Sequence, residues 1–227
     1  MDFSTIIENI IKIMSKYWDE FLIKGVSVTL SLSVIAVFFG SIFGSLLALA
    51  KGSRFKVLRF FVSAFVEIIR GTPILLQLYV GYFVVPLAFP FLGLSTYASI
   101  AVALVINSSA YVSEVVRSGV QAVDAGQMEA ARSLGLTKAQ AMIKVVLPQA
   151  IKNILPALGN EFIMIVKETS LASTFFVGDL MTSYLTVRGA TFLAFESLLI
   201  VGVIYFILSF TLSKGVAAFE RRLKASD

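Results

Sequence analysis

The fold class is decided by the stretch between Lys24 and Lys51, residues 25–50, which reads GVSVTLSLSVIAVFFGSIFGSLLALA. It contains no charged residue, and as a helix it is long enough to cross the hydrocarbon core of a bilayer, which takes about 20 apolar residues. The hydrophobic residues, 58% of the chain, gather in several such blocks separated by short charged stretches. This distribution is typical of a membrane protein rather than of a soluble domain.

Four further apolar blocks follow the first one. Together they predict an all-α membrane protein of one domain, residues 1–227, with five transmembrane helices at about residues 25–50, 60–91, 95–112, 148–166 and 191–213. Before the first span, Ile6, Ile10 and Ile13 recur at helical spacing, which predicts an amphipathic helix over residues 1–20 on the outer membrane surface. Lys12 and Lys16 interrupt this segment and argue against a cleavable signal peptide.

Basic residues are distributed unevenly between the loops. If there are five spans, 13 of the 19 Lys and Arg residues fall on one side, in the loop after the first span, in the stretch 117–152 and in the C-terminal tail. Because such residues accumulate in cytoplasmic loops, the N-terminus is predicted outside and the C-terminus inside.

Composition also excludes several classes of function. The chain has no Cys and no His, and its 14 acidic residues show no metal-ligand spacing. It therefore lacks the commonest general base and metal ligand, which argues against an intramembrane enzyme. The net charge of +5 is explained by topology, since no basic stripe is interleaved with exposed aromatics. No Gly-x-x-x-x-Gly-Lys-[Ser/Thr] string is present, so any ATP hydrolysis belongs to another polypeptide.

The longest polar stretch, residues 117–147, contains a predicted helix-turn-helix. Asp124 followed by Gln127 fits a capping box at the start of a helix, and Gly135 supplies a left-handed residue at its end. Thr137 followed by Gln140 fits a second capping box, and Pro148 is expected to close the region. The simplest interpretation of such a hairpin is a solvated connection between two spans.

One ordered string in this hairpin favours a more specific interpretation. It reads Glu129-Ala130-Ala131, three residues, Gly135, nine residues, Val145, one residue, Leu147-Pro148. This string resembles the signature loop of bacterial ATP-binding-cassette (ABC) import permeases, with Val in place of Ile at position 145. Further matches to the branch for polar amino acids are Arg70-Gly71-Thr72-Pro73 with Gln77, and Lys167-Glu168-Thr169-Ser170-Leu171.

The resemblance implies the type I ABC importer permease fold and a transport function. The loop then acts as a coupling helix that docks on an ATPase through Glu129, Ala130, Ala131 and Gly135. The implied partners are two ATPase subunits that bind ATP and Mg, a second permease subunit of the same or a different chain, and an external amino-acid-binding protein. The chain itself is then no enzyme, holds no cofactor and resides as a multi-pass protein in the bacterial cytoplasmic membrane. Alternatives are a permease for an opine or another small charged solute, and a secondary transporter.

Polar residues within the spans supply candidate substrate contacts. Glu67 and Arg70, three residues apart, are expected to pair with each other. Thr72 as a cap and Pro73 as a first helical residue predict a broken span whose half-helix N-terminus suits a carboxylate, and the alternative is an ordinary proline kink.

Glu161 is the second candidate contact, since it lies about eleven residues past Lys152 and hence roughly 16 Å into the bilayer. It is interpreted either as a ligand for a cationic group, or as a structural partner of Lys167, Arg70 or a neighbouring subunit. The full set of predicted substrate-binding residues is Glu161, Thr72, Gly71, Gln77, Ser170 and Asn160.

Overall fold

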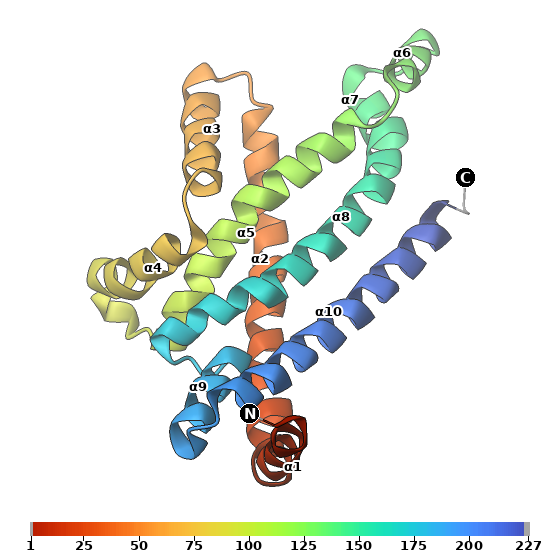
Figure 1. Ribbon diagram of the computed structural model, residues 1–227. Coiled ribbons are helices and arrows are strands. Elements are labelled where there is room, and N and C mark those ends of the chain that lie inside the picture. The colour runs from red at the N-terminus through yellow and green to blue at the C-terminus, as the bar shows by residue number, and fades with distance from the viewer. Residues whose placement is uncertain (1, 225–227) are drawn as a thin grey trace. The chain divides into compact units, whose positions relative to one another are not determined.

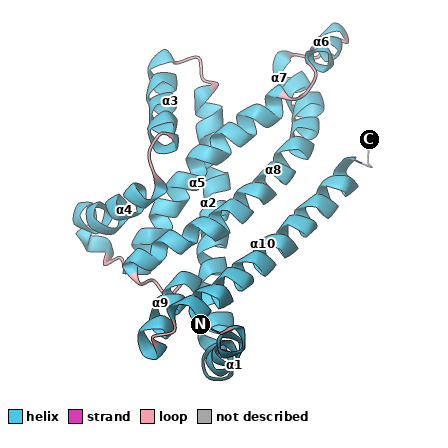
Figure 2. Ribbon diagram, in the orientation of Figure 1, coloured by secondary structure: helices cyan, strands magenta, loops and turns pink. Residues whose placement is uncertain are grey.

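The computed structural model describes residues 2–224, and in this range the chain consists of helices and short connections, without a strand (Figure 1 and Figure 2). The helices are α1 (Phe3–Asp19), α2 (Val26–Lys51), α3 (Lys56–Arg70), α4 (Ile74–Ala88), α5 (Thr96–Gln121), α6 (Ala125–Ser133), α7 (Lys138–Ala141), α8 (Leu147–Glu168), α9 (Leu180–Thr191) and α10 (Ala194–Lys224). π-Helical turns at Glu20–Gly25 and Met142–Val146 join α1 to α2 and α7 to α8, and 3-10 turns cover Pro90–Leu92 and Thr169–Phe175. The prediction of an all-α protein is confirmed.

Four helical stretches are long and apolar enough to cross a membrane: Phe3–Lys51, which is kinked at Tyr17, Thr96–Gln121, Lys138–Phe175 and Ala194–Leu223. The pair α3 and α4 is a fifth candidate if both helices are counted as one broken span. Helices suit the membrane because each helix hydrogen-bonds its own backbone N–H and C=O groups. Hydrocarbon offers these groups no hydrogen-bonding partner. The count agrees with the five predicted spans, whereas several of the predicted boundaries are wrong.

The second and third predicted spans differ most from the observed helices. Residues 60–91 form two helices, and the second of them ends at Ala88, just before Pro90. The third span was expected to end at Val112, but α5 continues to Gln121. Its charged residues Glu114 and Arg117 pair with each other, so their charges do not mark the end of the helix.

Pro148 does not close the hairpin, as the sequence suggested, because the helical stretch continues from Lys138 to Phe175. A proline lacks an N–H donor, and its ring crowds the carbonyl four residues earlier. Here that carbonyl belongs to Lys144, which lies in the π-helical turn Met142–Val146. The wider turn accommodates the proline without ending the helix.

The helix α9 was not predicted, because its polar residues do not read as a membrane span. Its start is fixed by Asp179, whose side chain accepts a hydrogen bond from the backbone N–H of Met181 (3.0 Å). Leu180, Tyr184 and Val187 follow at helical spacing and are buried.

The chain divides into two compact units, each assembled from three separate segments. The first gathers residues up to Ala36, Thr72–Val105 and Ile163–Leu212, and the second gathers Val37–Gly71, Ile106–Phe162 and the residues from Ser213 onward. The predicted single domain over residues 1–227 stays a prediction, and its residues 1 and 225–227 lie outside the described range.

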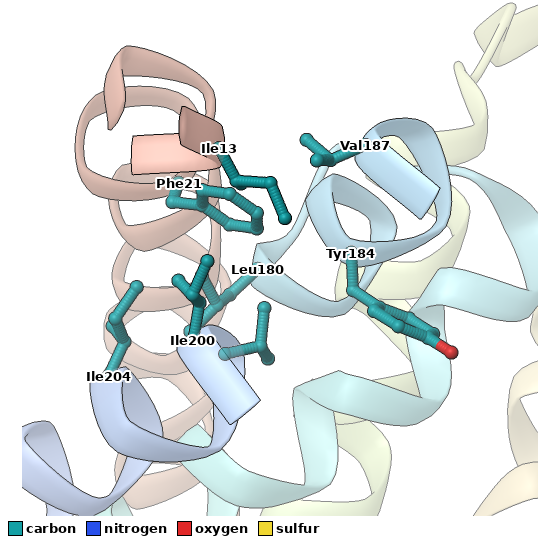
Figure 3. Close-up of a cluster of buried hydrophobic side chains, with 8 residues drawn as sticks. Ile13, Phe21, Leu180, Tyr184, Val187, Ile200 and Ile204 are labelled. Atoms are coloured by element: carbon teal, nitrogen blue, oxygen red, sulfur yellow. The ribbon is translucent and has the colours of Figure 1, made fainter. Parts of the chain in front are cut away.

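The first unit has a hydrophobic core in which α1 takes part (Figure 3). The core consists of Ile13, Phe21, Leu180, Tyr184, Val187, Ile200, Val201 and Ile204. Asn9 of α1 also donates a hydrogen bond from Nδ2 to Oε1 of Glu196 on α10 (2.8 Å), which satisfies a carboxylate that is 1% exposed. The predicted N-terminal helix is therefore present, and one face of it packs against the rest of the chain.

In the second unit, α2 and α5 approach each other at glycines. A Cβ atom on Gly40 would lie 2.6 Å from Oγ of Ser108, and one on Gly44 would lie 2.7 Å from the carbonyl oxygen of Ser109. Real Cβ atoms essentially never come so close to other atoms. Small residues four apart allow membrane helices to pack backbone against backbone, so this spacing sets the distance between α2 and α5.

Cysteines introduced at Ser133 and Thr186 test the predicted orientation. Both residues are exposed, and the chain has no native Cys. In intact cells, we expect a membrane-impermeant maleimide to label Thr186→Cys and to leave Ser133→Cys unlabelled until the membrane is permeabilised, because α8 separates the two positions. Labelling of both positions from the same side contradicts five spans with the N-terminus outside.

Candidate functional site

The chain breaks between α3 and α4 at Gly71, Thr72 and Pro73. The N–H of Gly71 caps α3 by donating to the carbonyl of Glu67 (2.8 Å). Pro73 is the N-cap of α4, in an extended conformation with ψ 136°, so the expectation that Thr72 caps and Pro73 starts this helix is wrong. Thr72 instead accepts two hydrogen bonds from Nε2 of Gln77, at its Oγ1 (3.0 Å) and at its carbonyl (3.1 Å).

Two separate helices on either side of this break contradict an ordinary proline kink, and the pair forms a broken span or a re-entrant loop. α4 begins inside the second predicted span, and the N–H groups of its first turn have no acceptor within the helix. The helix dipole adds partial positive charge at the same point. The start of α4, with Gln77 holding Thr72 in place, therefore has the chemistry to receive a carboxylate.

Glu161 on α8 is 5% exposed, which places a carboxylate inside a membrane helix bundle. It also interacts with other residues of the chain, so its candidacy rests on burial and position rather than on a missing partner. Its neighbour Asn160 is exposed, and Ser170, in the 3-10 turn after α8, is half-buried with its carbonyl accepting from Oγ of Ser173 (2.7 Å).

The two compact units share the predicted substrate residues between them. Glu161, Asn160 and Gly71 belong to the second unit, and Thr72, Gln77 and Ser170 belong to the first. The structure brings Thr72 and Gln77 into contact. Binding of one solute by both Glu161 and the start of α4 stays a prediction.

A cluster of charges surrounds Glu114 of α5 in the second unit. Lys51 Nζ lies 2.5 Å from its Oε1. Arg117 donates from Nε (2.9 Å) and from a terminal nitrogen (2.7 Å) to its Oε2. Arg70 approaches the same oxygen at 3.7 Å and stacks over the ring of Tyr111, 5.7 Å from its centroid. One carboxylate thus joins the ends of α2 and α3 to α5.

The predicted pair of Glu67 with Arg70 is wrong, because the ion-pair partner of Arg70 in the described part of the chain is Glu114. Sequence spacing favoured Glu67, which lies one turn away on the same helix. A partner 44 positions along the chain leaves no such local signal. The recurrence of Tyr111, Glu114 and Arg117 at helical spacing indicated a polar face on α5 but not its partner.

The hairpin after α5 is fixed by its capping residues, although one predicted capping box is incomplete. Asp124 accepts a hydrogen bond from the N–H of Gly126 (2.7 Å), and the side chain of Gln127 contacts Gln149 (3.3 Å) instead of completing the box. Gly135 has φ +88°, the left-handed turn that was predicted.

The second capping box, between Thr137 and Gln140, is present in both directions. The turn between the two helices is further held by Arg132, which donates to the carbonyl of Leu136 (2.9 Å). Hydrogen bonds between nearby residues therefore fix the start of each helix of the hairpin and the turn between them.

The tip of this hairpin presents a mixed surface. Glu129, Ala130 and Gly135 are exposed, whereas Ala131 is 4% exposed and packs inward. Leu134, which precedes the left-handed glycine, is 85% exposed. Leu134 is thus a single exposed apolar side chain at the turn, and the sequence reasoning did not single it out.

Comparison with known proteins gives one consistent result. Residues 21–225 match the family model for binding-protein-dependent transport system inner membrane components. The chain is 38% identical over 207 residues to the arginine transport system permease protein ArtQ of Bacillus subtilis (strain 168), with 91% of this chain and 94% of that protein covered. It is 40% identical over 206 residues to the putative glutamine transport system permease protein GlnP of Rickettsia bellii (strain RML369-C), with the same coverage of both chains.

Solved structures give the same result for the fold. A chain from the crystal structure of an amino acid ABC transporter with histidines has a TM-score of 0.87 and 43% identity, with 98% of this chain and 99% of that chain covered. A chain of the inward-facing MetNI methionine ABC transporter has a TM-score of 0.72 at 23% identity, which supports the fold alone. The chain therefore belongs to the family of binding-protein-dependent transport system inner membrane components and is a multi-pass permease subunit of an ABC transporter.

Proposed function

We propose that the chain forms the translocation pathway of an ATP-driven importer for polar amino acids, with a preference for cationic ones. The observation that carries the substrate class is Glu161, a carboxylate that is 5% exposed in a membrane helix. A buried charge is costly and usually functional in this setting. The relatives are named as an arginine and a glutamine permease, which supports polar amino acids as the substrate class.

In this proposal, the two ends of an amino acid meet two different groups. The start of α4, whose first N–H groups have no acceptor within the helix, receives the α-carboxylate. Glu161 receives the α-ammonium group or a cationic side chain, which offsets the desolvation of its own charge. Gly71, Gln77, Ser170 and Asn160 supply further polar contacts along the pathway. An acidic amino acid is disfavoured because its side chain would repel Glu161.

ATP is bound and hydrolysed, with Mg, by a separate ATPase subunit in this proposal, and the permease needs no cofactor of its own. The ATPase docks on the hairpin through Glu129, Ala130, Ala131 and Gly135, and we add to this set Leu134, whose side chain is exposed. A second permease subunit completes the pathway, and an external binding protein delivers the substrate. Closure of the ATPases moves the hairpin, and the movement passes to α5 and α8, which flank it.

Substitution of Gly135 by Val tests the docking role of the hairpin. Valine at φ +88° strains the backbone by about 1–2 kcal/mol, while a Cβ atom there meets nothing within 4 Å. We expect the amount of ATPase recovered with the tagged permease to fall roughly ten-fold, with membrane insertion unchanged.

Gly93→Val is the matched control, since Gly93 also has positive φ (+54°) and open space around its Cβ position but lies outside the hairpin. The control is expected to recover the ATPase as the wild type does. If Gly135→Val recovers ATPase and transports at wild-type levels, the hairpin does not dock through this turn.

Substitution of Glu161 by Gln tests the substrate preference, because it keeps the shape of the side chain and removes the charge. We expect kcat/KM for arginine uptake to fall roughly ten-fold or more relative to kcat/KM for glutamine, since a hydrogen bond to a charged group contributes about 1.5–3 kcal/mol. The measurement is uptake of both amino acids by the reconstituted complex.

Glu196→Gln is the control for loss of a buried carboxylate, because Glu196 is 1% exposed and already bonded to Asn9. It should leave the ratio of arginine to glutamine uptake unchanged. An unchanged ratio in Glu161→Gln as well would remove the basis for the cationic preference. Wild-type uptake of both amino acids by Glu161→Gln would make Glu161 a structural residue.

A further inference from the structure

A pocket of about 270 Å³ lies beside the charge cluster in the second unit, and the proposed transport mechanism does not use it. It is formed where the C-terminal end of α3 meets the last turns of α5. Its lining residues are Arg70, Tyr111, Glu114, Val115, Arg117 and Ser118. We refer to it as the Arg70 pocket.

The charges at the Arg70 pocket do not balance. Lys51, Arg70 and Arg117 surround one carboxylate, that of Glu114, which leaves an excess of two positive charges. Two of these cations are fully engaged with it, Lys51 at 2.5 Å and Arg117 through two hydrogen bonds. Arg70 is the cation of the three that makes no hydrogen bond to this carboxylate.

Contacts other than hydrogen bonds hold Arg70 in position. Its guanidinium stacks over Tyr111, and its nearest carboxylate oxygen is 3.7 Å away, beyond hydrogen-bonding distance. Within residues 2–224 the guanidinium donates no hydrogen bond, and the side chain is 42% exposed. A stacked guanidinium with free N–H groups is pre-organised to bind a phosphate or carboxylate in a bidentate manner.

The surroundings of the pocket indicate a lipid as the source of the anion. α3, which ends at Arg70, carries the exposed apolar side chains Phe60, Phe61 and Ile68. Lys51 and Arg117, which both contact Glu114, belong to the basic stretches predicted to be cytoplasmic, so the pocket lies toward that side. Basic pockets between membrane helices on that side are typical sites for acidic phospholipid headgroups.

We propose that the Arg70 pocket binds the phosphate of an acidic phospholipid from the cytoplasmic leaflet, with Arg70 as its main ligand and Tyr111 as a second donor. The acyl chains then lie along the apolar face of α3. The phosphodiester of such a lipid carries one negative charge and offsets half of the excess positive charge around Glu114, so the lipid also stabilises the junction of α2, α3 and α5. This inference does not depend on the identity of the transported solute.

Titration of the full-length permease in detergent with phosphatidylglycerol, followed by native mass spectrometry, tests the proposal. We expect the wild type to bind one phosphatidylglycerol at least ten-fold more tightly than phosphatidylcholine, whose headgroup is neutral overall. Arg70→Gln should weaken phosphatidylglycerol binding roughly ten-fold, as expected for loss of charged hydrogen bonds. Arg70→Lys keeps the charge and the ion pair with Glu114, and it should show an intermediate affinity for phosphatidylglycerol. If Arg70→Gln fails to fold, Arg70→Lys replaces it in the comparison with the wild type.

Arg59→Gln is the matched control, because Arg59 is an exposed cation on the same helix outside the pocket. It should bind phosphatidylglycerol as the wild type does. Equal affinities of wild type, Arg70→Lys and Arg70→Gln overturn the proposal, as does an equal loss in Arg59→Gln. Binding of glycerol phosphate as tight as that of the lipid overturns the assignment to a lipid and identifies the ligand as a free phosphate.

Discussion

Two glycines on α2, Gly40 and Gly44, allow α2 and α5 to pack at backbone distance, and the second unit depends on this contact. Lipid tails are as apolar as leucine, so membrane helices associate through close van der Waals packing rather than through hydrophobic burial. The contact fixes α2 beside α5, and one consequence is that Lys51 reaches Glu114 at 2.5 Å. Lys51 and Arg117 both form ion pairs with Glu114, and Arg70 lies 3.7 Å from the same carboxylate.

The Glu114 cluster lies at a point where several functional segments meet. Arg70 is the last residue of α3 and precedes the break at which α4 begins, while α5 continues from Glu114 to the hairpin that we propose docks on the ATPase. In the proposed mechanism, a movement of the hairpin acts on α5 directly and on α3 through the carboxylate of Glu114. The hairpin is suited to transmit such a movement, because Asp124 caps its first helix and the Thr137–Gln140 box caps its second.

Sequence alone predicted the features that depend on local chemistry. The apolar blocks gave the helices, and Gly135 and Thr137 gave the turn of the hairpin, because caps and left-handed glycines act over a few residues. Features that depend on distant contacts were missed: the pairing of Arg70 with Glu114, the core position of Leu180 in α9, and the π-helical turn that lets Pro148 lie inside a helix. Of the candidate site, the contact between Thr72 and Gln77 is present, but Thr72 receives a hydrogen bond instead of capping α4.

In the proposed function, this permease moves an amino acid at the expense of ATP hydrolysed by a partner. This is tested by uptake of labelled arginine into liposomes that contain the complete complex, with Mg-ATP inside and the binding protein outside. We expect uptake that requires both ATP and the binding protein and that persists when ionophores abolish all ion gradients. Uptake that proceeds without ATP and stops when a proton or sodium gradient is removed would instead identify a secondary transporter.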